Sequence, residues 1–126
     1  MNNEVIFIDT NVLLETVLKD RKYAEKAQEY ISSRDVIISP LTAHLFVYFG
    51  KKDGLKLDLL LEMLAKHRFT DFGTNEVIWA IKNHQSDDFE DSLQIACALL
   101  QGCHTFATFD KKLAQKYKEF INVHIL

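Results

Sequence analysis

The chain has 126 residues, is 48% hydrophobic and 26% charged, and carries a formal net charge of −3 at pH 7. These values predict one soluble globular domain over residues 1–126, large enough to bury a core without disulfides or a structural metal. The net charge excludes a general attraction to nucleic acid or to anionic membranes. A local basic patch or a bound metal can still reverse the field near a site.

No stretch of the sequence is apolar for long enough to span a membrane, and no basic segment followed by an apolar run indicates a signal peptide. We therefore expect no membrane association and a cytoplasmic location. Cys97 and Cys103 lie in apolar segments, without a CxxC pair or zinc-ligand spacing. Buried, reduced thiols are their expected state.

Short apolar runs alternate with helical patterns along the chain. The apolar runs predict strands over 5–8, 36–38, 69–72, 104–109 and 121–125. The helical patterns predict helices over 12–18, 21–33, 40 to about 50, 55–66, 75–83, 88–101 and 111–118. Such alternation favours a three-layer α/β/α fold, with a mainly parallel sheet covered by helices on both faces. The last strand alternates apolar and polar residues, which indicates an edge position.

Polar residues mark the beginnings of several expected helices. Asp20 is a suitable N-cap for the helix at 21–33, and Ser39–Pro40 has the pattern of an N-cap followed by proline at the first helical position. Asp87 and Glu90 have the spacing of a capping box for the helix that follows them.

Two of the expected strands end in an aspartate. Asp9 directly follows the run 5–8, and Asp110 follows the run 104–109. Strands of a parallel sheet have their carboxyl ends at one edge, where open α/β sheets bind ligands. The two carboxylates would therefore lie close together if their strands are neighbours. Thr10 and Asn11 suit the turn from the first strand into the next helix and could cap it.

A second pair of acids, Asp88 and Asp91, lies three residues apart at the start of a helix. A right-handed crossover places the beginning of that helix at the same sheet edge as Asp9 and Asp110. Four converging carboxylates would repel one another, and a hard cation with oxygen ligands, Mg²⁺ or Mn²⁺, would relieve the repulsion.

Each acid also has a structural explanation. Asp9 and Asp110 suit helix caps, and Asp88 and Asp91 would complement a helix dipole. Their combination at one sheet edge favours the metal site. The sequence offers no serine or cysteine nucleophile with a partner base, no histidines at metal-ligand spacing and no glycine-rich phosphate loop.

The ordered segments Ile8–Asn11, Ser39–Thr42, Asp88–Leu93 and Ala107–Asp110 resemble the motifs of PIN domains. The resemblance covers essentially the whole chain. It implies a parallel sheet of strand order 3-2-1-4-5 and a metal-dependent ribonuclease, and many small members of the family are toxins of VapC-type toxin–antitoxin pairs. It thus implies RNA as substrate and an antitoxin protein as partner. We also expect a homodimer, and the apolar helices at 12–18 and 40–49 are the candidates for a dimer or antitoxin surface.

The resemblance also implies roles for individual residues. Asp9, Asp91 and Asp110 match the acids that bind Mg²⁺ or Mn²⁺, and Asp88, which often accompanies them, would orient or deprotonate a water. The supporting polar residues would be Asn11 and Thr108, and the lysines that would guide the RNA backbone are Lys111, Lys112, Lys116 and Lys118. A solvated helix face explains those lysines equally well.

The chain departs from the family pattern at Leu45, where the motif that begins at Ser39 normally continues to a glutamate. An apolar side chain cannot hold a metal, so the site would be weaker, hold one metal instead of two, or be inactive. His44 and Glu15 are possible but unsupported substitutes. A degenerate PIN domain that binds RNA or a protein without cleavage is therefore the alternative function. A receiver-like signalling domain phosphorylated on Asp9 is a third, although it would need paired acids after the first strand.

Overall fold

The computed structural model describes residues 4–18, 21–85 and 87–126. The strands are β1 (Val5–Ile8), β2 (Asp35–Ile38), β3 (Arg68–Phe69), β4 (Thr105–Thr108) and β5 (Asn122–Ile125). The helices are α1 (Thr10–Glu15), α2 (Ala24–Ser32), α3 (Pro40–Lys52), α4 (Leu57–Leu64), α5 (Thr74–Lys82), α6 (Phe89–Leu100) and α7 (Lys111–Tyr117). The chain therefore alternates between strands and helices as the sequence predicts.

All five strands form one sheet of order β3-β2-β1-β4-β5, and each neighbouring pair is parallel. The predicted fold class and strand order are thus confirmed, including β5 at one edge. The order also excludes the receiver-like alternative, because receiver domains have the order 2-1-3-4-5. In this sheet β1 lies between β2 and β4, which makes the strands that precede Asp9 and Asp110 direct neighbours.

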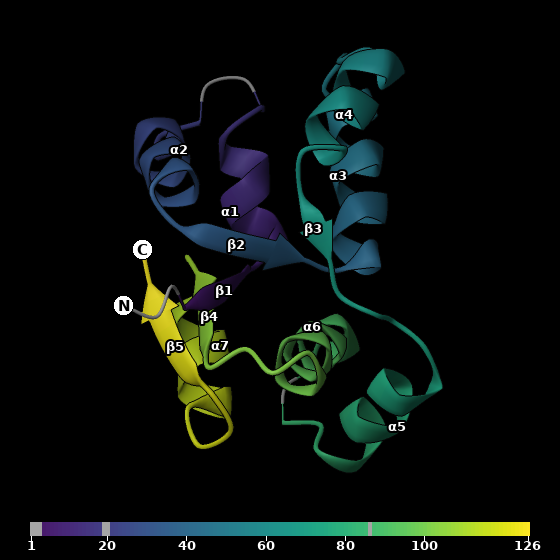
Figure 1. Ribbon diagram of the computed structural model, residues 1–126, viewed down its shortest axis with the longest axis vertical. Helices are drawn as coiled ribbons and strands as arrows, with labels where there is room; N and C mark the ends of the chain where they lie inside the picture. The colour runs from purple at the N-terminus through teal and green to yellow at the C-terminus, as the bar shows by residue number, and fades with distance from the viewer. Residues whose placement is uncertain (1–3, 19–20, 86) are drawn as a thin grey trace.

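Helices cover both faces of the sheet, and each face has its own core. Ile6, Ile8 and Ile38 point to the layer of α1–α4, where they pack with side chains such as Phe46 and Leu60. The other face carries Phe7, Ile37 and Phe106, which pack against α6 and α7. Figure 1 shows α1–α4 on one side of the sheet and α5–α7 on the other. The short β1, buried on both faces, is the centre of the fold.

Two predictions of helix boundaries are wrong. The first helix begins at Thr10 rather than 12, because Asp9 caps it with a side-chain bond to the Thr10 N–H. Helix α3 continues to Lys52 and does not end near Gly50. A Cβ on that residue would lie 2.6 Å from Cδ2 of the buried Leu60, so the glycine allows close helix packing.

Of the predicted helix caps, one is confirmed, one is wrong and one lies outside the described residues. Ser39 caps α3 as predicted, with its Oγ accepting a bond from the Thr42 N–H at 3.0 Å. The N-cap of α6 is Asp88 rather than Asp87. Asp20 lies outside the described residues, and the helix expected after it begins at Ala24.

Cys97 and Cys103 are buried and form no disulfide, and burial raises the pKa of the Cys97 thiol to about 11. Burial also raises the pKa of the Cys103 thiol, so both thiols are protonated near neutral pH. The expected burial of both side chains is confirmed. Within the described ranges, no helix has the length and apolar character that a membrane crossing needs.

Candidate functional site

Asp9 lies at the carboxyl end of the central strand and is also the N-cap of α1. Its Oδ1 accepts a hydrogen bond from the Thr10 N–H at 2.8 Å, and its Oδ2 accepts one from the Thr108 hydroxyl at 2.8 Å. Thr108 is the last residue of β4, so the second bond joins the ends of two neighbouring strands. These bonds hold the Asp9 carboxylate in one orientation at the sheet edge.

Thr108 is the centre of the polar contacts between β1 and β4. Its fully buried hydroxyl donates to Asp9 and accepts bonds from the Asn11 side-chain amide at 3.3 Å and from the Asp110 N–H at 3.0 Å. The Asn11 Oδ1 accepts from the Phe109 N–H at 3.4 Å. Asn11 and Thr108, predicted as supporting residues, therefore connect Asp9 with the segment that carries Asp110.

Asp110 is the N-cap of α7, with its Oδ1 accepting from the N–H groups of Lys112 and Leu113 at 2.9 and 3.2 Å. Its negative charge acts on Asp9, because it helps to raise the pKa of that carboxyl. The expected approach of Asp9 and Asp110 at the ends of adjacent parallel strands is what the structure has.

The pKa of Asp9 is raised to about 6, mainly because burial removes water from the carboxylate. The bonds from Thr108 and Thr10 lower the pKa, whereas the charges of Asp110 and Glu90 raise it further. The two side-chain charges that act on Asp9, those of Asp110 and Glu90, are thus both negative. A carboxylate in this position gains stability from a proton or from a cation that enters the site.

Glu90, in the first turn of α6, is a carboxylate that the sequence reasoning treated only as part of a capping box. Burial and the neighbouring Asp88 raise its pKa, and His44 on α3 lowers it. Because Glu90 also acts on Asp9, the beginning of α6 lies at the same sheet edge, as the right-handed crossover predicts.

The two predicted acids of α6 differ in their surroundings. Asp88 is exposed, and its Oδ1 caps the helix by accepting from the Glu90 N–H at 3.0 Å. Asp91 is half-buried, one turn into the same helix, and its N–H donates to the Asp88 carbonyl at 3.1 Å. Both belong to the helix start that lies near Asp9.

A buried polar network lies behind the acids and was not predicted. The Gln94 amide donates to the hydroxyls of Thr10 and Thr42 at 3.0 and 2.9 Å, and its Oε1 accepts from the Ser39 hydroxyl at 2.7 Å. All four side chains are buried. The network therefore connects the middle of α6 with the beginnings of α1 and α3. A glutamine within an apolar helix gives no sequence signal for this role.

Leu45 is half-buried on α3, one turn after Thr42. Glu15, considered as a substitute acid, is buried and pairs with Arg21 at 3.4 Å while accepting from the Tyr23 N–H at 3.1 Å. Those partners assign Glu15 to the connection between α1 and α2 rather than to the acid pair. His44 is exposed and close enough to Glu90 to affect its pKa.

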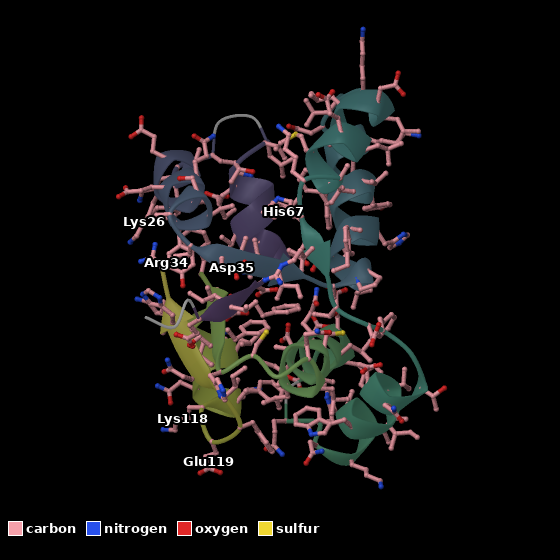
Figure 2. The ribbon with its side chains drawn as sticks, viewed as in Figure 1. Lys26, Arg34, Asp35, His67, Lys118 and Glu119 are labelled. Atoms are coloured by element: carbon pink, nitrogen blue, oxygen red, sulfur yellow. The ribbon has the colours of Figure 1, made fainter. Side chains whose placement is uncertain are left out.

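The lysines of α7 are exposed, but only two lie next to Asp110. Lys111 and Lys112 form the first turn of the helix. Lys118 is the C-cap at the opposite end, and Figure 2 shows it beside Glu119 at the turn into β5. Lys111 and Lys112 are thus the lysines of α7 that lie next to Asp110 in the chain.

The sequence profile of the PIN domain family matches residues 6–119. The chain belongs to the PIN domain family. No curated protein is similar enough in sequence to be matched with it. The recognition made from the four sequence motifs is therefore confirmed.

Solved structures share this PIN fold. A toxin–antitoxin complex from Klebsiella pneumoniae has a TM-score of 0.76 and 15% identity, covering 94% of this chain and 95% of that chain. VapC20 of Mycobacterium tuberculosis, a sarcin–ricin loop cleaving toxin, has a TM-score of 0.70 and 15% identity, covering 87% and 93%. VapBC2 from Rickettsia felis, bound to a DNA fragment from its promoter, has a TM-score of 0.69 and 13% identity, covering 97% and 98%.

PIN-domain proteins are typically nucleases and generally use divalent metal ions. Over residues 4–18, 21–85 and 87–126, no three His, Cys, Asp or Glu side chains are grouped so that they could hold a metal. Mg²⁺, however, is commonly held by one or two carboxylates, with waters and substrate phosphates as its other ligands. The oxygen donors of Asp9 and Asp110, under mutual repulsion at the sheet edge, fit that kind of binding.

Proposed function

We propose that this PIN domain is a metal-dependent ribonuclease and the toxin of a VapC-type toxin–antitoxin pair. The observation that carries the proposal is the convergence of Asp9 and Asp110 at the ends of β1 and β4, joined through Thr108. Family membership supplies the class of reaction. The start of α6 adds the charge of Glu90 at the same edge, and Asp91 follows Glu90 in the first turn of that helix.

Asp9 and Asp110 would hold Mg²⁺ or Mn²⁺, and Asp91, which is not grouped with them in the described part of the chain, would join them when the ion binds. When bound, the ion supplies positive charge at a phosphate and lowers the pKa of a water. The protein positions the groups for hydrolysis: Thr108 and the Thr10 N–H fix the Asp9 carboxylate, and Asn11 fixes Thr108. Lys111 and Lys112 would bind the RNA backbone, since lysine contacts to phosphate set position rather than sequence.

In the reaction, the oxygen of a water forms a bond to phosphorus while a P–O ester bond of RNA breaks. The water gives up its proton to a carboxylate, and the leaving oxygen takes a proton from solvent. Asp88, exposed at the beginning of α6, is the carboxylate that we assign to orient or deprotonate the water. Its Oδ1 already accepts the Glu90 N–H, which restricts the orientation of the carboxylate.

The test is cleavage of a mixture of single-stranded and structured RNA in the presence of Mn²⁺ or Mg²⁺ and after addition of EDTA. Asp9→Asn is expected to lose cleavage, because it removes a ligand charge while keeping the size of the side chain. Asp58→Asn, which neutralises an exposed carboxylate on α4, is the matched control and is expected to cleave normally. Cleavage that survives EDTA or Asp9→Asn would contradict the proposal.

The toxin role has a separate test. Expression of the wild-type chain is expected to arrest growth, and co-expression of the neighbouring gene, as candidate antitoxin, is expected to relieve the arrest. Asp9→Asn should not arrest growth. We also expect the protein to lie in the cytoplasm and to form a homodimer. Light scattering on the purified protein would measure its oligomeric state.

Leu45 supports a second function, that of a degenerate PIN domain that binds RNA or a protein partner without cutting. An apolar residue replaces the glutamate that the motif implies, and no three-ligand metal group is formed within the described residues. RNA binding without cleavage under every metal condition would favour this function. Cleavage gained by Leu45→Glu would then show that the missing acid is the cause.

A further inference from the structure

A cleft of about 550 Å³ lies beside the acids, between the α1–α2 connection, α3 and the segment after β4. Its lining includes Asn11 and Phe109 together with Arg21, Lys22 and Tyr23. We propose that this cleft is a base-stacking subsite, in which an unpaired nucleotide of single-stranded RNA stacks on Tyr23 while Arg21 and Lys22 bind its phosphates. The choice of RNA as the ligand of this cleft rests on the proposed ribonuclease function.

The side chain of Asn11 connects the cleft to the acids. Asn11 lines the cleft and donates to the Thr108 hydroxyl, which in turn donates to Asp9. Phe109, which also lines the cleft and donates its N–H to Asn11 Oδ1 at 3.4 Å, directly precedes Asp110. An RNA strand with one phosphate at the acids would therefore place a neighbouring nucleotide in this cleft.

The aromatic rings of the cleft are suited to a nucleobase. Tyr23 stacks on Phe109, with ring centroids 5.3 Å apart and an interplanar angle of 24°. Tyr23 lines the cleft and is 44% exposed. Phe49 of α3 lines the same cleft and is 38% exposed. Exposed aromatic rings bind unpaired bases without regard to sequence, because every base has a π face.

The charges of the cleft favour a nucleic acid over a neutral or cationic ligand. Lys22 places its Nζ 5.3 Å from the centroid of the Tyr23 ring, and Arg21 forms an ion pair with Glu15 at 3.4 Å. A guanidinium carries five N–H donors, so this pair leaves Arg21 able to bind a phosphate as well. Two cations and one buried carboxylate give the cleft a net positive charge in a chain whose net charge is −3. This local reversal is the complement of a phosphate backbone.

The experiment measures binding and not cleavage. Fluorescence anisotropy in EDTA would follow a short labelled single-stranded RNA, with RNA integrity checked on a gel afterwards. Tyr23→Ala is expected to weaken binding by roughly 5- to 150-fold, which corresponds to the contribution of about 1–3 kcal/mol from one stacked base. Tyr23→Phe keeps the ring and is expected to bind like the wild type. A duplex and an abasic strand are expected to bind more weakly and to be insensitive to Tyr23→Ala.

The chain offers matched controls on α3. Tyr48 is 53% exposed and has the Lys52 Nζ 5.8 Å above its ring, but neither residue lines the cleft. Tyr48→Ala and Lys52→Gln are expected to bind RNA normally, whereas Lys22→Gln is expected to lose affinity. Thermal unfolding of each variant shows whether it is folded, and Lys22→Gln keeps the test decisive if Tyr23→Ala does not fold.

The outcomes separate this inference from the proposed function. Equal effects of Tyr23→Ala and Tyr48→Ala, or undiminished binding of the abasic strand, would overturn the subsite. A cleft that binds no RNA but binds an antitoxin peptide through Tyr23 would overturn it in favour of a protein groove. If the wild type binds single strands through Tyr23 but never cleaves them, the subsite stands and the nuclease proposal fails. If the wild type cleaves RNA but Tyr23→Ala binds RNA as tightly as the wild type, the nuclease proposal stands and the subsite fails.

Discussion

Asp9→Asn is expected to stabilise the metal-free protein while it abolishes activity. The folded-state pKa of Asp9, about 6, lies above its ordinary value of 3.8 because burial and two neighbouring carboxylates disfavour the charged form. At about 1.36 kcal/mol per pKa unit, this difference corresponds to about 3 kcal/mol at high pH. Because Asp9 is half-buried and its bond from Thr108 would weaken, we expect a net gain of about 1–2 kcal/mol.

The sign of the effect depends on pH. A raised folded-state pKa means that the folded protein binds the proton more tightly than the unfolded chain does, so the cost of Asp9 is absent below 3.8 and grows as the pH rises through 6. The advantage of Asp9→Asn is therefore expected above pH 6 and should vanish towards pH 4. The difference between the two proteins isolates Asp9 from the other carboxylates that titrate in this range.

The assay is thermal unfolding in EDTA over a pH series. Above pH 6, Asp9→Asn is expected to raise Tm by about 4–8 °C for a domain of this size. The control Asp58→Asn, an exposed carboxylate in the first turn of α4, is expected to leave Tm unchanged or to lower it slightly. A lower Tm for Asp9→Asn at every pH would refute the reasoning, because the carboxylate would then contribute to stability in the metal-free protein.

Adding the metal offsets the stability advantage of Asp9→Asn over the wild type. A cation at about ten times its Kd stabilises the protein that binds it by about 1.4 kcal/mol. Mn²⁺ or Mg²⁺ is therefore expected to raise the Tm of the wild type and to leave that of Asp9→Asn nearly unchanged. An equal response of both proteins would place the metal elsewhere.

The remaining predictions concern neighbouring parts of the fold. Gln94→Leu removes the partner of buried hydroxyls on α1 and α3 and is expected to cost about 1–3 kcal/mol in urea unfolding. Leu45→Glu is expected to increase metal-dependent cleavage of RNA, and an unchanged rate would show that the existing acids suffice. Gly50→Ala would place a Cβ against Leu60 and is expected to lower stability by about 1–3 kcal/mol, measured in the same way, although alanine is the better helix former. Cys97 is expected to react slowly with a thiol reagent until the protein is unfolded, because it is buried and its pKa is about 11.

The sequence was sufficient for the layers of this fold because local pattern and tertiary burial agree. The run Val5–Ile8 has no polar residue, and its strand is the one covered on both faces. Strand order cannot be read from such a run, since any buried parallel strand has the same pattern. It came from the resemblance of the ordered motifs to the PIN family. Gly50 shows the limit of local signals: the residue that suggested a helix end allows two helices to pack closely.

Parts of the site could be predicted for a related reason. An aspartate after each of two neighbouring parallel strands must come to one sheet edge, which places Asp9 beside Asp110. Glu90 and Gln94 were missed because their roles depend on which face of α6 turns towards β1. That rotation is set by packing across the whole core, and the spacing of apolar residues along α6 does not reveal it.

The structural and the functional explanations of the aspartates are not alternatives in this protein. Asp9, Asp88 and Asp110 each cap a helix through Oδ1, as the structural explanation requires. A cap fixes one carboxylate oxygen on backbone N–H groups, and the position of the other oxygen follows from it. For Asp110, Oδ2 lies outside the cap; for Asp9, Oδ2 meets the Thr108 hydroxyl. Helix capping thus gives the carboxylates the fixed orientation that the proposed cation site would need.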